Sequence, residues 1–152
     1  MAEEAIVLIC GSRTWHDVGY IDRFVGTLVP GACTVIHGAA PGADSIAGYC
    51  ANARGLPVRQ YPADWSTHGK AAGFIRNQQM LDMERVCFVV AFTMNLFESK
   101  GTFDMARRGV AKGLSVMINP SSIGNCQQVL KEHAGNYFIC REDAWINPWR
   151  KK

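Results

Sequence analysis

The densest group of chemically useful side chains lies in residues 62–80. This stretch reads P-A-D-W-S-T-H-G-K-A-A-G-F-I-R-N-Q-Q-M and contains an acid, an indole, an amide and several bases. Asp64 begins a run of turn and cap formers, and good helix formers continue over residues 70–83. The sequence therefore predicts a loop that leads into a helix.

One face of this predicted helix carries groups suited to a ligand. Glycine lets a flat molecule approach the backbone, and a guanidinium binds oxyanions with two parallel hydrogen bonds. Phe74, Ile75 and Leu81 are expected to point away from this face, into the core. A surface helix with a solvated arginine is the alternative. Helical spacing places four residues on the face: Gly73, Arg76, Asn77 and Met80.

The rest of the chain alternates between apolar runs and helical patterns. Such alternation is typical of an α/β fold with a mainly parallel sheet. Residues 86–92, V-C-F-V-V-A-F, are the most hydrophobic run and are expected at the centre of the sheet. The predicted strands are 5–10, 33–37, 57–61, 86–92 and 114–118, and the predicted helices are 16–28, 43–54, 70–83 and 101–112.

The length of 152 residues favours one domain over residues 1–152, with a core at 5–119. Residues 120–152 are expected to add a helix at 124–133 and a strand at 137–140, followed by a tail that contains Trp145 and Trp149. The helix, strand and tail are predicted to extend the edge of the same core, with a surface for a partner as the alternative role of the two tryptophans.

Composition excludes several classes of protein. The formal net charge of +3 is too small to indicate duplex DNA binding by itself. No apolar run approaches the roughly 20 residues of a membrane span, and no signal peptide pattern is present. Six cysteines lack metal-site spacing and are expected to be reduced. We therefore expect a cytoplasmic protein with no membrane association, and assign no metal and no cofactor.

Four turns follow predicted strands or precede helices, and ligands bind at the carboxyl ends of strands in open parallel sheets. These turns are residues 11–13, 38–44, 64–70 and 100–102. Their small residues and free N–H groups favour a phosphate or carboxylate. Plain structural roles remain open: Asp44 and Asp64 as helix caps, and Arg13 as a cation–π partner of Trp15. P-loop, G-x-G-x-x-G and G-x-S-x-G motifs are absent.

Together, the motifs G-S-R-T-W, H-G-A-A-P-G-A-D, P-A-D-W, G-K-A-A-G-F-I-R-N-Q-Q-M and G-T-F-D-M resemble the YspA-type (DUF2493) branch of the SLOG superfamily, over residues 6–118. This superfamily is related to the Lonely Guy phosphoribohydrolases and to DprA. The resemblance implies a Rossmann-like three-layer fold with helices on both faces of the sheet. It also implies a nucleotide or nucleotide-derived ligand, held by residues 11–13, the turn 38–44, and Gly101 and Thr102.

With the residues singled out above, the predicted ligand-binding set is Gly11, Ser12, Arg13, Trp15, Gly38, Ala39, Gly42, Ala43, Asp44, Asp64, Trp65, Lys70, Gly73, Arg76, Asn77, Gly101 and Thr102.

The chain departs from the Lonely Guy enzymes at a catalytic position. Arg76 and Met80 are similar to their Arg-x-x-x-Met stretch, but Met105 stands where their G-G-x-G-T-x-x-E motif has its Glu. Methionine cannot act as a base. Hydrolysis of an N-glycosidic bond would therefore need another carboxylate, Asp104 or Asp44, with Arg76 beside it.

Three functions follow as hypotheses. The first is a domain that binds or senses a nucleotide or nucleotide-derived ligand. The alternative is a phosphoribohydrolase that cleaves the N-glycosidic bond of a nucleoside monophosphate. The second alternative, possible but not favoured, is a DprA-like binder of single-stranded nucleic acid that uses Trp15, Trp65, Arg107 and Arg108. The resemblance also implies a homodimer.

Overall fold

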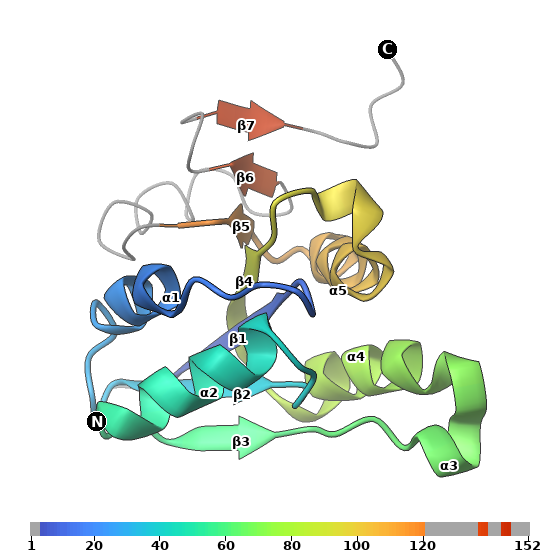
Figure 1. Ribbon diagram of the computed structural model, residues 1–152, viewed down its shortest axis with the longest axis horizontal. Helices are drawn as coiled ribbons and strands as arrows, with labels where there is room; N and C mark the ends of the chain where they lie inside the picture. Colours follow the sequence, from blue (N-terminus) through green and yellow to red (C-terminus); the bar gives the residue numbers. More distant parts are fainter. Residues whose placement is uncertain (1–3, 121–136, 140–143, 147–152) are drawn as a thin grey trace.

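The computed structural model describes residues 4–120, 137–139 and 144–146, and the side chains of residues 4–120. Strands of the described part form one sheet in the order β3-β2-β1-β4-β5-β6-β7 (Figure 1). Neighbours are parallel except β6 and β7, which are antiparallel. β4 lies at the centre of this order, which confirms the prediction. The bounds are β1 (Ala5–Gly11), β2 (Cys33–His37), β3 (Val58–Gln60), β4 (Val86–Phe92), β5 (Val116–Ile118), β6 (Tyr137–Ile139) and β7 (Ala144–Ile146).

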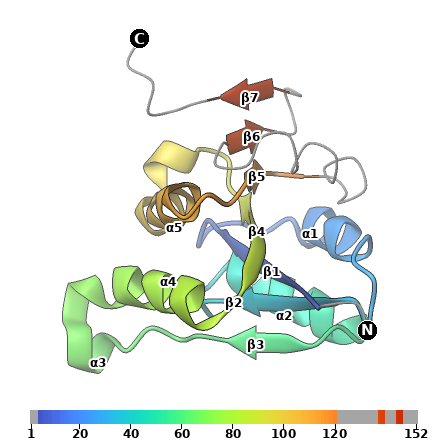
Figure 2. The same ribbon diagram turned by 180° about the vertical axis from the view of Figure 1, so that it is seen from behind.

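Helices cover both faces of the sheet, so the Rossmann-like α/β prediction is confirmed. α1 and α2 lie on one face, and α4 and α5 lie on the other (Figures 1 and 2). The α-helices are α1 (Val18–Val25), α2 (Ala43–Ala53), α3 (Trp65–His68), α4 (Ala72–Met83) and α5 (Lys100–Ala111), and the 3₁₀ turns are η1 (Gly69–Ala71) and η2 (Leu96–Glu98).

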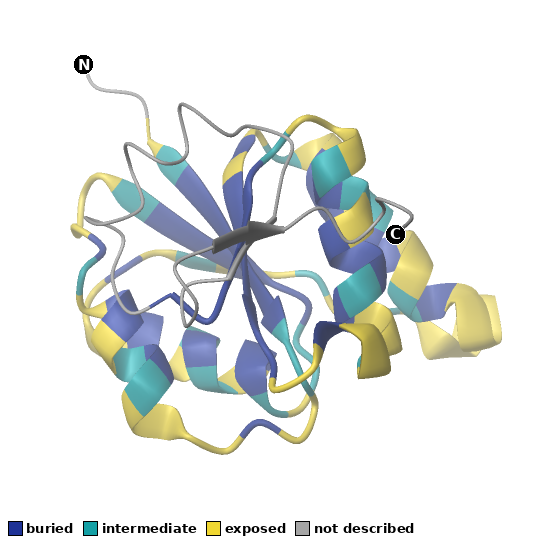
Figure 3. Cartoon of the chain, turned by 90° about the horizontal axis from the view of Figure 1, so that it is seen from above, coloured by how far each residue is buried: buried dark blue, intermediate teal, exposed yellow. Residues whose placement is uncertain are grey.

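The apolar run of β1 explains why the sheet is buried on both sides. Successive side chains of a strand point to opposite faces, so Val7 and Ile9 pack with α1 and α2. Leu8 and Cys10 pack with α4 and α5. Figure 3 shows the strands mostly buried between the helical layers.

The predicted helix over residues 70–83 corresponds to α4, which begins at Ala72, and α3 forms within the predicted loop. α3 and η1 precede α4, and the chain turns at Gly69, whose φ is +56°. The expectation that Phe74 and Ile75 point into the core is wrong, because they are 40% and 44% exposed. The face that carries Arg76 is itself the buried face, so these neighbours are turned outward. Leu81 is buried as expected.

After residue 120 the structure describes only β6 and β7. The predicted strand at 137–140 corresponds to β6, and Trp145 lies in β7, which pairs with β6. The predicted helix at 124–133 and Trp149 lie outside the described residues. Four cysteines of the described part are free thiols, Cys10, Cys33, Cys50 and Cys87.

Asn119, which follows β5, forms hydrogen bonds to the residue that follows β4. Its Oδ1 accepts a hydrogen bond from the Thr93 backbone N–H at 2.9 Å, and its Nδ2 donates to the Thr93 carbonyl at 2.8 Å. The residue is buried and has a φ of +53°, a conformation that asparagine tolerates better than most residues. Thr93 begins the loop after β4, so this pair fixes where that loop starts.

We predict that Asn119→Ala lowers the free energy of unfolding by about 2–3 kcal/mol, because two buried backbone groups of Thr93 lose their partner. Urea denaturation measures this loss. Asn52→Ala, on the exposed surface of α2, is the matched control and should change stability by less than about 0.5 kcal/mol. Equal effects of the two substitutions would contradict this role for Asn119.

Candidate functional site

A cavity of about 1120 Å³ opens beyond the carboxyl ends of β1 and β4. These two strands are neighbours, and the chain leaves them toward opposite faces of the sheet, to α1 and to α5. Such a switch point is where open α/β sheets bind ligands. The loops after both strands and the first turns of α4 and α5 form the cavity walls.

The cavity brings together most of the residues selected from the sequence. Twelve of them line it: Gly11, Ser12, Arg13, Trp15, Asp44, Trp65, Lys70, Gly73, Arg76, Asn77, Gly101 and Thr102. Gly38, Ala39, Gly42, Ala43 and Asp64 do not line the cavity. Asp64 instead caps α3, where its Oδ1 accepts a hydrogen bond from the Thr67 backbone N–H at 3.1 Å.

The glycines at this end of the sheet have two different roles. A Cβ at Gly42 would lie 2.4 Å from the Ser12 carbonyl oxygen, and its φ is +79°, so chain packing requires glycine there. A Cβ at Gly38 would lie 2.4 Å from Nη1 of Arg76, so this glycine makes room for the guanidinium. At Gly101 a Cβ would meet no atom within 4 Å. Only the last of these three leaves space for a ligand.

Arg76 is the buried cation of the cavity, with 9% of its surface exposed. Its Nη1 donates to the carbonyls of Gly38 and Tyr61, and its Nε donates to Asn77 Oδ1 at 3.1 Å. Nη2 has no hydrogen-bond partner in the described part of the chain, and no carboxylate there forms an ion pair with Arg76. Burial lowers the pKa of the guanidinium, which nonetheless stays protonated.

Asp44 is the buried carboxyl group of the cavity. Burial raises its pKa to about 6, although Oδ2 accepts hydrogen bonds from the backbone N–H groups of Gly38 and Ala40 at 3.0 and 3.3 Å. The charge of Arg76 opposes the rise. Asp44 therefore titrates near neutral pH inside the cavity.

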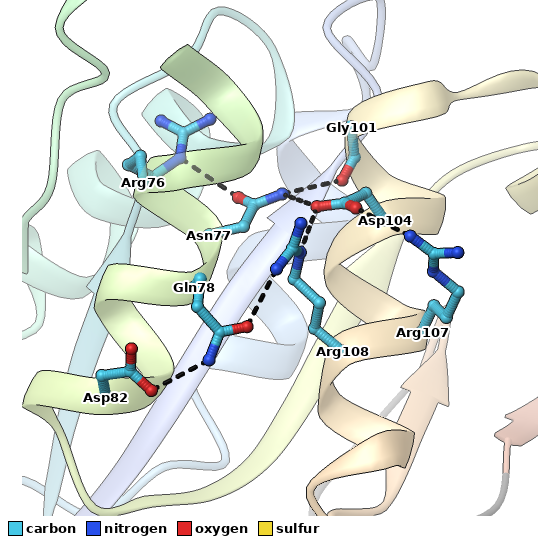
Figure 4. Close-up of polar contacts among 8 residues, drawn as sticks. All are labelled: Arg76, Asn77, Gln78, Asp82, Gly101, Asp104, Arg107 and Arg108. Carbon is cyan, nitrogen blue, oxygen red and sulfur yellow. Dashed lines mark hydrogen bonds and ion pairs between the residues drawn. The ribbon is translucent and has the colours of Figure 1, made fainter. Parts of the chain in front are cut away.

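Asn77 links the cavity to a charge network between α4 and α5 (Figure 4). Its Nδ2 donates to Asp104 Oδ2 at 3.1 Å and to the Gly101 carbonyl at 3.2 Å. Arg108 Nε donates to the same Asp104 oxygen at 2.8 Å, and Arg107 lies 3.5 Å from the other oxygen. Asp104 is buried and does not line the cavity. Its visible role is to join the two helices.

Arg13 makes the cation–π contact that the sequence left open, but with a different partner. Its Cζ lies 5.5 Å from the centre of the Trp65 ring. Trp15 is buried against Tyr20 and Phe92 and donates from Nε1 to the Asp17 carbonyl at 2.9 Å. Arg13 and Trp65 thus reach toward each other from the β1 loop and from α3.

Sequence reasoning missed one wall of the cavity. The loop after β4 supplies Thr93, Met94, Asn95, Glu98 and Ser99. The signal was present, since this loop follows the carboxyl end of the predicted central strand. Other lining residues outside the predicted set are Cys10, Thr14, His16, Asp17, Tyr20, Ala40, Phe74, Met80 and Lys100.

An open parallel sheet covered by helices on both faces, with a cavity at its switch point, defines a Rossmann-like α/β domain. Residues 5–68 match the YspA, cpYpsA-related SLOG family. The Gene 61 protein of Mycobacterium phage D29 is 34% identical over 119 residues, covering 73% of this chain and 93% of that protein. The chain belongs to the YspA, cpYpsA-related SLOG family. No solved structure matches the chain significantly.

Two searches of the described residues give negative results. None of the helices there is long and apolar enough to cross a membrane. Within the same residues, no group of three or more His, Cys, Asp or Glu side chains is arranged to hold a metal ion.

The raised pKa of Asp44 predicts a pH dependence of stability. A carboxyl group whose pKa rises from 3.8 to about 6 on folding binds its proton more tightly in the folded state. Stability should therefore fall as pH rises through this window, by about 3 kcal/mol from Asp44 alone. Asp44→Asn removes this titration.

Urea denaturation of both proteins at pH 4, 5, 6 and 7 checks the prediction. As pH rises, the free energy of unfolding of the wild type should fall relative to that of Asp44→Asn. The comparison isolates Asp44, because the other carboxylates contribute equally to both proteins. Parallel pH profiles would show that Asp44 does not titrate in this range.

Proposed function

We propose that the cavity binds the phosphate of a nucleotide or nucleotide-derived ligand. The observation that carries this proposal is the state of Arg76. A buried charge is normally paired with an opposite charge or a ligand, because removing it from water costs several kcal/mol. Arg76 has neither an ion pair nor a partner for Nη2 in the described residues. An oxyanion beside Nη2 would complete its coordination.

The surroundings of Arg76 support an anion of this size and charge. Arg13 and Lys70 also line the cavity and bring two further cations to it. The first turn of α5 lines the opposite wall, and Ser99 makes no capping hydrogen bond to its N–H groups. Helix N-termini favour phosphates. The space beside Gly101 lies at this same helix start.

The two alternative functions are less well supported. Of the two carboxylates considered for hydrolysis, Asp44 does line the cavity, but its Oδ2 accepts hydrogen bonds from the backbone N–H groups of Gly38 and Ala40. Hydrolysis through Asp104 would need a carboxylate in the cavity, yet this group is held by Arg108 and Asn77 between two helices. Binding of single-stranded nucleic acid through Arg108 would need a free cation, yet Arg108 also donates to Gln78 Oε1 at 2.9 Å. Nucleotide binding without assigned turnover is the better supported proposal.

Isothermal titration with inorganic pyrophosphate and a panel of nucleoside mono- and diphosphates tests the proposal. Arg76→Ala should weaken the affinity of any phosphate that binds the wild type by about 10- to 150-fold, since a hydrogen bond to a charged group contributes about 1.5–3 kcal/mol. Arg107→Ala removes an exposed arginine outside the cavity and should leave affinity unchanged.

A second variant separates ligand binding from stability. Arg76→Ala removes contacts that hold the fold, whereas Gly101→Leu places a side chain in empty cavity space at a helical position. Gly101→Leu should keep the unfolding free energy and lose phosphate binding. Wild-type protein that binds no member of the panel, or Gly101→Leu that binds as well as wild type, would reject the proposed site.

We also propose that the chain forms a homodimer through α4. The outer surface of this helix carries a stripe that lines a shallow groove. A two-fold interface must be self-complementary. In an antiparallel pair of α4 helices, Phe74 would face Met83, Ile75 would face Asp82 and Gln78 would face Gln79. The stripe is Phe74, Ile75, Gln78, Gln79, Asp82 and Met83.

Light scattering after size exclusion tests this assembly. Wild-type protein should have the mass of two chains, and Met83→Lys should give monomers, because it places two charges in the apolar contacts between Met83 and Phe74. Val29→Lys, at a residue 61% exposed outside α4, is the control and should remain dimeric. A wild-type mass of one chain would exclude the homodimer.

A further inference from the structure

The mouth of the cavity carries large apolar side chains in water. Trp65, Phe74 and Met94 are 49%, 40% and 73% exposed, and all three line the cavity. They come from α3, from α4 and from the loop after β4, so the chain brings them together from separate elements. Clustered exposed apolar groups mark binding surfaces. The cationic residue Arg76 lies buried in the same cavity, so mouth and interior differ in chemistry.

Trp65 is presented for stacking. It begins α3 on a segment, residues 64–71, in which every residue is exposed. Cη2 of its ring would lie 3.5 Å from a Cβ at Gly73, so the indole lies close over α4 at a position with no side chain. The Arg13 guanidinium lies 5.5 Å from the ring centre. A planar cation therefore already occupies a place where a planar ring would stack.

We propose that Trp65 is a stacking subsite for the heteroaromatic base of the ligand, at the mouth of the cavity that Met94 also lines. This inference rests on the proposed function, because it places the base relative to a phosphate held by Arg76. The base takes the place of the Arg13 guanidinium on the indole, while the charge of Arg13 in the cavity attracts the phosphate of either ligand. Both groups are flat and attracted to an aromatic face, so they compete for it.

A base fits these residues better than a sugar phosphate alone. Every nucleobase has a π-face that stacks on an indole, and the polarizable sulfur of methionine makes favourable contacts with aromatic rings. A ligand without an aromatic ring would leave the exposed Trp65 ring in water. The site thus predicts a ligand with an anionic end in the interior and an aromatic end at the mouth.

Isothermal titration with ribose 5-phosphate, AMP and GMP tests the subsite. Stacking on an aromatic side chain corresponds to about 5- to 150-fold in affinity, so AMP or GMP should bind the wild type more tightly than ribose 5-phosphate by a factor in this range. Trp65→Ala should remove that preference by lowering the affinities for AMP and GMP toward that for ribose 5-phosphate, and Trp65→Phe should retain most of the preference. Tyr49→Ala, at another exposed aromatic outside the cavity, should have no effect.

Arg13→Ala provides an independent readout. Removal of the competing guanidinium should increase the ratio of AMP to ribose 5-phosphate affinity, while the affinity for ribose 5-phosphate itself falls. A purely structural role for the Arg13–Trp65 contact would not change this ratio.

The outcomes separate the two proposals. Ribose 5-phosphate that binds as tightly as AMP and GMP, with no effect of Trp65→Ala, would overturn the subsite and leave the phosphate site standing. Trp65→Ala that weakens all three ligands equally would overturn the subsite as well. If none of the three binds the wild type, the phosphate site and the stacking subsite both fail.

Discussion

The buried guanidinium of Arg76 is the constraint on which the arrangement of this site depends. Its Nη1 is held by the carbonyls of Gly38, after β2, and Tyr61, after β3, so one side chain from α4 connects the ends of two strands. This contact requires glycine at position 38, since a Cβ there would overlap the guanidinium. Carbonyl oxygens offset only part of the cost of removing the cation from water. The remaining cost is the physical reason for the proposal that an anion binds beside Nη2.

Asp44 stabilises the charge of Arg76 through its electric field, although the two side chains form no ion pair. With a pKa of about 6 the carboxyl group is largely ionised at neutral pH, and its field stabilises Arg76 across the cavity. An anion beside Arg76 would take over this role and would repel the ionised carboxylate. It would therefore raise the pKa of Asp44 further, so linkage couples anion binding at this site to proton uptake. The two buried groups and the proposed anion would therefore form one electrostatic unit.

Sequence patterns were sufficient for the sheet and for the place of the cleft. Parallel strands bring their carboxyl ends together, so the turns at Gly11 and Gly101 converge for topological reasons alone. Sequence patterns were insufficient to predict which face of α4 is buried. A face with Arg76 and Asn77 reads as polar and exposed, and its burial depends on Asp104 and on backbone carbonyls that no local pattern reveals. The wrong prediction for Phe74 has the same cause. When the face of α4 that carries Arg76 is buried, side chains on the other face are exposed.

Glycine composition was ambiguous for a related reason. Glycine permits close approach, but the sequence does not say whether the approaching group is a ligand or the chain itself. At Gly42 the approaching group is the Ser12 carbonyl, and at Gly38 it is Arg76, whereas Gly101 faces open space. The distinction needs coordinates, since all three positions follow or begin elements at the same edge of the sheet.

The site divides into a fixed part and an exposed part, and this division has a consequence for recognition. Arg76, Asn77 and Thr102 are buried and tied to two helices and two strand ends. Trp65 and Lys70 belong to residues 64–71, a segment in which every residue is exposed. Rearranging this segment costs little free energy, because few buried contacts are lost. A rigid interior suits tight binding of a small anion, because no ordering cost accompanies it. An adjustable rim suits selection among ligands that share that anion, so the two properties can be altered separately by substitutions in different parts of the cavity.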